Sequence, residues 1–183
     1  MARSGNNHRG RLNNSVWEKI IKMINLRIEV KAFTETIRLA NTNDVARCAE
    51  LLGILLSQER EFNPDPARQR KGLEMIVENP DAGFVLVCEI DGIVQGMVLI
   101  LFTISTALGI KVAILEDMIV SPDFRGKGVG TRLVKQAIGS AVAKGCGRIT
   151  LLTDHDNSVA HRFYSKCGFT KSDMVAFRML IGS

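Results

Sequence analysis

Residues 115–130 read LEDMIVSPDFRGKGVG. The stretch begins as an apolar segment typical of a strand, turns at Ser-Pro, and continues with glycine at every second position before a helix predicted from Thr131 onward. Glycine adopts positive φ without a Cβ clash, so the chain can turn tightly there. The first N–H groups of a helix lack intrahelical partners and lie at the positive end of its dipole. This order of strand, glycine loop and helix predicts a backbone site for phosphate.

The spacing of the glycines excludes two common nucleotide motifs. A dinucleotide fingerprint requires G-x-G-x-x-G, whereas Gly126, Gly128 and Gly130 are one residue too close together. A Walker loop requires Gly-Lys followed by Ser or Thr, and here Lys127 is followed by glycine. The sequence therefore predicts an anion-binding loop of another class.

Two motifs resemble one family. Arg125, Gly128 and Gly130 fit the [Gln/Arg]-x-x-Gly-x-[Gly/Ala] loop of the GNAT superfamily of acyl-CoA-dependent N-acetyltransferases. A second stretch fits that family's N-x-x-A-x-x-F-Y-x-x-x-G-F signature at Asn157, Ala160, Phe163, Tyr164, Gly168 and Phe169. Both motifs occur in the family's order, and the resemblance covers roughly residues 36–181.

The resemblance implies acetyl-CoA as co-substrate. It implies that two parallel strands splay apart and that the pantetheine amides pair with the backbone of Met118, Ile119 and Val120. It implies that Asn157 contacts the pantetheine arm and that Tyr164 reaches the thiol sulfur. Backbone N–H groups of the loop would hold the pyrophosphate, at Arg125, Gly126, Lys127, Gly128, Val129, Gly130 and Thr131.

The chemistry of acetyl transfer assigns two further roles. The amine arrives as an ammonium and must lose a proton, and the departing thiolate must gain one. The resemblance favours Glu116 as the base, with water as the alternative, and Tyr164 as the acid. Asp117 is expected on the opposite face of the strand, because side chains alternate.

These roles predict an enzyme, an N-acetyltransferase that acts on a primary amine of a small molecule by direct attack. The alternatives are a protein or peptide N-acetyltransferase and a non-catalytic acyl-CoA-binding regulatory module. Acids in the segments that the family uses for acceptor binding suit a cationic amine, although exposed helix charge also explains them. They are Glu59, Glu61, Asp65 and Glu74.

Charge and composition exclude other classes. The net charge is +5, and residues 1–32 carry seven basic and two acidic groups, so the rest of the chain is neutral and a general nucleic-acid surface is not expected. No run approaches about 20 apolar residues, so no membrane insertion is expected. With no signal-peptide pattern, the predicted location is cytoplasmic. The four cysteines are scattered, which argues against a metal site or a disulfide framework.

Hydrophobic periodicity predicts two parts. Residues 1–33 form a basic N-terminal extension, a disordered tail followed by a short amphipathic helix over 16–24. Residues 34–183 form the acetyltransferase domain, and the family's members commonly pair, so a homodimer is the prior expectation. Helices are expected at about 45–57, 66–77, 131–144 and 158–167.

The predicted fold class is α/β, or α+β by some schemes. It is a GNAT-like mixed, mostly antiparallel sheet of six to seven strands with helices on both faces. Residues 111–120 and 148–153 should form the splayed parallel pair, because a helix connects them. The other strands are expected at 36–40, 84–90, 93–102 and 174–181, with 26–31 as a seventh.

Overall fold

A computed structural model describes residues 15–19, 22, 33–59 and 62–181. The chain separates into residues 1–33 and residues 34–183, and each part is described by itself. In the first part, residues 15–19 and 22 are helical. The predicted disordered tail at 1–14, the remainder of the amphipathic helix and the strand at 26–31 lie outside the described residues.

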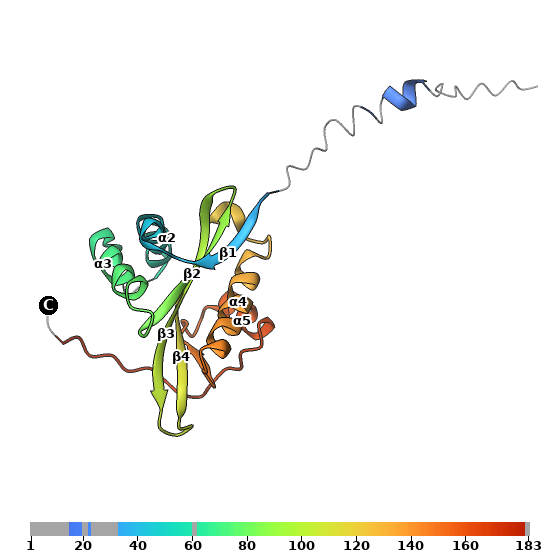
Figure 1. The fold of residues 1–183 in the computed structure, drawn as a ribbon. Helices are drawn as coiled ribbons and strands as arrows, with labels where there is room; N and C mark the ends of the chain where they lie inside the picture. The colour runs from blue at the N-terminus through green and yellow to red at the C-terminus, as the bar shows by residue number, and fades with distance from the viewer. Residues whose placement is uncertain (1–14, 20–21, 23–32, 60–61, 182–183) are drawn as a thin grey trace, which may run out of the picture. The chain divides into compact units, whose positions relative to one another are not determined.

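The domain is built on a mixed sheet in which neighbouring strands follow chain order (Figure 1). The first four strands pair antiparallel and the last pair is parallel, as predicted. The predicted count of six to seven strands is wrong for the described residues, where the sheet has five strands. They are β1 (Glu35–Leu39), β2 (Gly83–Ile90), β3 (Ile93–Ser105), β4 (Ile110–Val120) and β5 (Ile149–Leu151).

The strand predicted at 174–181 does not form. This segment is extended but carries no strand pairing, and Phe177 and Leu180 are 92% and 95% exposed. The neighbouring strand β5 has only three residues, which is too short an edge to pair with eight. The Arg178 guanidinium of this segment lies 5.2 Å from the ring centre of Phe62, which precedes α3.

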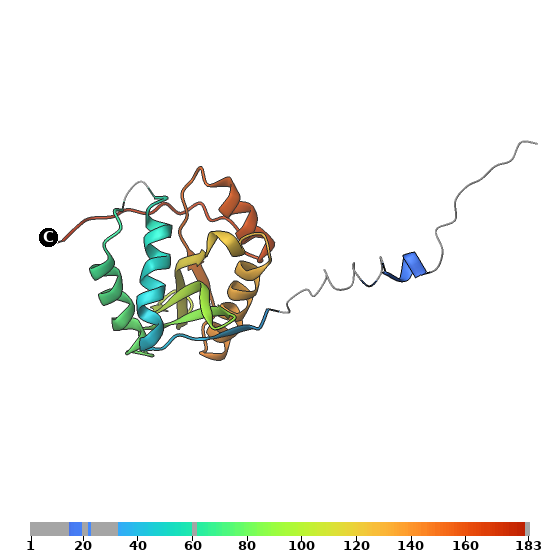
Figure 2. The ribbon, with the colours of Figure 1, turned by 90° about the horizontal axis from the view of Figure 1, so that it is seen from above.

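Helices cover both faces of the sheet, as predicted (Figure 2). On one face, Leu51 and Leu73 pack in a core with Val87 and Met97. On the other face, Leu133 packs with residues of β2, β3 and β4. The helices are α2 (Val45–Leu56), α3 (Pro66–Val77), α4 (Val129–Ala143) and α5 (Ser158–Lys166), with short 3-10 turns at η1 (Thr42–Asp44) and η2 (Pro122–Phe124).

Candidate active site

The glycine loop joins β4 to α4 and has the geometry of an anion site. Gly126 and Gly128 have φ of 73° and 79°, in the left-handed region that favours glycine. Helix α4 begins at Val129, two residues before the predicted start. Its N-cap is Gly128, which supplies no side-chain cap hydrogen bond, so the first N–H groups of α4 are left for another acceptor.

The basic side chains of the loop contact the protein itself. Arg125 Nε donates to the Val120 carbonyl at 3.0 Å, at the end of β4. The Lys127 ammonium lies 4.9 Å from the ring centre of Phe124. Arg132, in the first turn of α4, pairs with Glu35 of β1. Arg125 and Arg132 thus make hydrogen bonds within the protein, and the contact of the loop backbone with an anion stays a prediction.

The pairing between the parallel strands β4 and β5 ends at Leu115. Strand β4 pairs with β5 at Ala113, Ile114 and Leu115. Within the described residues, positions 116–120 have no β5 partner, while Met118–Val120 pair on the other side with β3. The edge of β4 is thus unpaired on the β5 side at the predicted pantetheine positions.

A β-bulge lies at the two acids of β4. Met118 pairs with Val98 and Leu115 pairs with Ile100, so Glu116 and Asp117 together oppose the single residue between those partners. Leu115 and Met118 consequently pack in the same core, although strict alternation would put them on opposite faces. The bulge interrupts the strict alternation on which the prediction for Asp117 rests.

The two acids have different surroundings. Glu116 is exposed. Asp117 is half-buried, and its burial, together with the nearby charges of Glu116 and Glu59, raises its pKa to about 6. The fold thus brings the end of α2 close to β4. Sequence reasoning assigned Asp117 no role, because no residue pattern marks a bulge.

Asp65, a predicted acceptor acid, caps α3 through bonds from the N–H groups of residues 67 and 68, both at 3.1 Å.

Tyr164 lies on α5, within electrostatic range of Asp117. Its ring makes edge contacts with Phe163 and Phe169, with centres 5.1 and 5.8 Å away. Burial raises the pKa of its hydroxyl to about 12, and the charges of Cys167 and Asp117 act in the same direction. The hydroxyl therefore stays protonated at neutral pH. Tyr164 of the second motif and Asp117 of β4 are near enough to interact electrostatically.

Asn157 begins α5. Its side-chain oxygen accepts a hydrogen bond from the N–H of Ala160 at 3.0 Å, which is an N-cap contact. The residue therefore has a structural role in addition to the predicted contact with the pantetheine arm. The predicted contact with the pantetheine arm would then be made by the side-chain NH2 group of Asn157.

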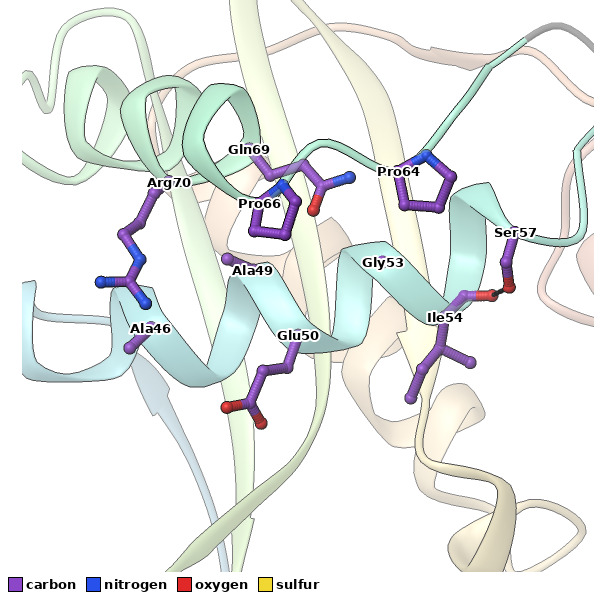
Figure 3. A pocket seen from close by; sticks show the side chains of 10 residues that line it. All are labelled: Ala46, Ala49, Glu50, Gly53, Ile54, Ser57, Pro64, Pro66, Gln69 and Arg70. Carbon is purple, nitrogen blue, oxygen red and sulfur yellow. Dashed lines mark hydrogen bonds between the residues drawn. The ribbon is translucent and has the colours of Figure 1, made fainter.

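A groove of about 390 Å³ lies elsewhere, between α2 and α3 (Figure 3). The figure views it across the two helices with the strands behind. None of the predicted site residues lines it, so it is distinct from the candidate site. Its lining residues are Ala46, Ala49, Glu50, Gly53, Ile54, Ser57, Pro64, Pro66, Gln69 and Arg70.

The described part of the chain has neither a metal-binding cluster nor a membrane-spanning helix. No group of three or more His, Cys, Asp or Glu side chains is arranged there to hold a metal ion. No helix among the same residues is both long enough and apolar enough to cross a membrane.

Comparison with known proteins links this geometry to one family. Residues 48–169 match the sequence model of the acetyltransferase (GNAT) family. An uncharacterised N-acetyltransferase of Bacillus subtilis is 33% identical over 73% of this chain and 88% of its own length. A mouse thialysine N-epsilon-acetyltransferase is 37% identical over 42% of this chain. The chain spans only 44% of the length of that mouse relative, and the same share of a relative from Methanocaldococcus jannaschii.

A solved structure has the same fold. An aminoglycoside N-acetyltransferase in complex with CoA superposes with a TM-score of 0.69 over 81% of this chain and 96% of its own. Its sequence identity is 20%, so this likeness concerns the fold.

Proposed function

Because the chain belongs to the acetyltransferase (GNAT) family, we propose that it transfers an acetyl group from acetyl-CoA to a primary amine of a small molecule. One observation carries the proposal: the glycine loop connects the unpaired edge of β4 to the N-terminus of α4, and Tyr164 lies within electrostatic range of Asp117 on that edge. The loop suits a pyrophosphate, the edge suits a chain of amides, and the two side chains supply acids at the reacting end.

The residues present suit acetyl-CoA. The backbone of Met118, Ile119 and Val120 would pair with the pantetheine amides as an added strand. The N–H groups of residues 125–131 would hold the pyrophosphate, and the Asn157 amide would donate to the arm. Gly128 has a φ of 79°, which a residue with a Cβ would adopt only with strain. When bound, acetyl-CoA supplies the thioester that the amine attacks.

The acids would move the protons. Glu116 takes one proton from the acceptor ammonium and passes it to water. The amine nitrogen then bonds to the carbonyl carbon, the carbon–sulfur bond breaks, and Tyr164 protonates the sulfur. The second proton shed by the nitrogen restores the Tyr164 hydroxyl, so the site returns to its starting charge. Since the pKa of Tyr164 is raised to about 12, the proton passes late, when the sulfur carries most charge.

The acceptor would be a small cation. Glu59, Glu116 and Asp117 lie near enough to raise the pKa of the last of them, and a bound ammonium would relieve that repulsion. Two relatives are named for such acceptors, the mouse enzyme for thialysine and the solved structure for an aminoglycoside. We propose an acceptor of this class, an amine with at least one further positive charge.

An assay of thiol release tests the function. The full chain is incubated with acetyl-CoA and, separately, with thialysine, an aminoglycoside or a short lysine-containing peptide. We expect release of free thiol with a small cationic amine and little with the peptide. Turnover of the peptide alone would favour the protein acetyltransferase. Binding of acetyl-CoA without turnover of any acceptor would favour the regulatory module.

The pH dependence of turnover tests the separate roles proposed for Glu116 and Asp117. In the wild type, kcat/KM should rise with pH through about 6, because ionised Asp117 attracts the ammonium. Glu116→Gln should lower kcat by about 100-fold, as expected for loss of a general base. It should also shift the rise in kcat/KM to lower pH, because removing the neighbouring charge lowers the pKa of Asp117.

Asp117→Asn is the matched variant for this measurement. It should remove the rise near pH 6 while leaving kcat within about tenfold of the wild type. If Asp117→Asn instead abolishes turnover and Glu116→Gln retains it, the base is Asp117 and the assignment of Glu116 is wrong.

A further inference from the structure

An ion pair connects the first residue of β1 to the first turn of α4. Arg132 Nε lies 2.5 Å from Glu35 Oε1, and Arg132 Nη2 lies 2.6 Å from Glu35 Oε2. Two parallel bonds of this kind fix the plane of the guanidinium as well as its position. The side chains are 45% and 27% exposed, and surface pairs of this kind contribute little to overall stability. The effect of the pair is therefore expected on its immediate neighbours.

The remaining guanidinium nitrogen contacts the glycine loop. Arg132 Nη1 donates to the Lys127 carbonyl at 3.2 Å. It also occupies the space that a side chain at Gly128 would need, since a Cβ there would lie 2.8 Å away. In a trans peptide the carbonyl of one residue and the N–H of the next point in opposite directions. Holding the Lys127 carbonyl thus fixes the direction of the Gly128 N–H.

The strand that carries Glu35 is itself anchored. Arg38, also on β1, donates to Asp44 at 2.7 Å and to Glu89 at 2.6 Å. The bond from Arg38 lowers the pKa of the buried Asp44 carboxyl, so this contact remains charged across the neutral range. Glu35 is therefore attached to a fixed part of the sheet, and through Arg132 it transmits that position to the loop.

We propose that Glu35 and Arg132 form a positioning clamp, in which the sheet holds the Lys127 carbonyl and thereby orients the loop N–H groups toward the pyrophosphate of CoA. The clamp rests on the proposed donor site. Neither side chain needs to touch the ligand, so both are positioning residues. The pairing with Glu35 also occupies Arg132, which keeps the guanidinium in contact with the carbonyl rather than with a phosphate.

Calorimetric titration of the full chain with CoA tests the clamp without an acceptor. Arg132→Met should raise the Kd for CoA about tenfold, the size expected for one misplaced charge-assisted bond. Glu35→Gln should raise it about threefold, because the guanidinium then loses its fixed plane. Once an acceptor is known, both variants should raise KM for acetyl-CoA with kcat nearly unchanged. Arg68→Met is the control, because Arg68 forms a comparable exposed pair with Asp65 at the start of α3.

The charge-swapped double variant Glu35→Arg/Arg132→Glu separates positioning from simple stabilisation. The swap restores an ion pair between β1 and α4, but a glutamate at 132 has no donor for the Lys127 carbonyl. We expect the melting temperature to recover while the Kd for CoA stays raised. Recovery of both would mean that the pair only joins the two elements, and would overturn the clamp.

Two other outcomes count against it. Tighter CoA binding by Glu35→Gln would mean that Arg132, once released, contacts the phosphate directly. Unchanged binding by folded Arg132→Met would overturn the clamp but leave the proposed donor site intact. A wild-type chain that does not bind CoA would overturn the donor site and the clamp together.

Discussion

Tyr164→Phe should lower kcat by about 100-fold while KM for acetyl-CoA changes by less than about twofold. The substitution keeps the ring and its edge contacts with Phe163 and Phe169, and it removes only the hydroxyl. A general acid contributes about 10²–10⁴-fold to rate, and the lower end suits a phenol whose raised pKa makes it a weaker donor. Steady-state thiol release with the identified amine measures the effect.

A second donor sharpens this test. A thioester whose thiol is more acidic needs less protonation as it leaves, so the loss caused by Tyr164→Phe should shrink with that donor. Phe169→Leu is the control, because it removes an aromatic contact of Tyr164 and keeps the hydroxyl. Retention of more than half of kcat by Tyr164→Phe with acetyl-CoA would show that sulfur is protonated by another group.

Gly83→Ala should destabilise the domain by about 3 kcal/mol or more, a loss of the size that backbone strain and overpacking produce. Gly83 begins β2 and pairs with Leu101 of β3. A Cβ at this position would lie 2.0 Å from the Ile100 carbonyl oxygen and 3.1 Å from the Leu101 Cα. Both atoms belong to backbone, so no side-chain rotation relieves the contact and the two strands must separate. Urea unfolding followed by circular dichroism measures the change.

Gly72→Ala is the matched control for this measurement. Gly72 lies within α3, and nothing is within 4 Å of a Cβ built there. The same substitution should therefore stabilise the protein by about 0.5–1 kcal/mol, because alanine loses less backbone freedom than glycine in a helix. A Gly83→Ala variant within 1 kcal/mol of the wild type would mean that β2 and β3 can move apart at this end.

Local signals predicted most of the elements. The helix predicted over 66–77 begins and ends at those residues, with proline at its first position. The strands predicted at 84–90 and 93–102 form a hairpin, and both residues of the Asp91-Gly92 turn between them have positive φ. The two family motifs predicted the glycine loop and the position of Tyr164. These features depend on residues close together in the chain, which is why the sequence alone sufficed.

Features that depend on distant contacts were missed. The apolar segment at 174–181 has the composition of a strand, but a strand needs a neighbouring edge and β5 offers only three residues. The burial of Asp117 depends on elements that meet only in the fold, and the ion pair between Glu35 and Arg132 joins residues 97 positions apart. The roles of Glu116 and Tyr164 and the homodimer stay predictions.

The bulge in β4 shifts the alternation of side chains along the strand by one residue. Before it, odd-numbered residues such as Ala113 and Leu115 pack toward α4, and after it even-numbered residues such as Met118 and Val120 do so. Glu116 and Asp117 therefore behave as one two-residue unit. Removing or adding a single residue there would turn the downstream side chains that now face α4 to the other face of the sheet, and the reverse. Grafting this site onto another strand requires moving both acids together with the bulge, and a one-residue alignment gap at this point would mispair every residue up to Val120.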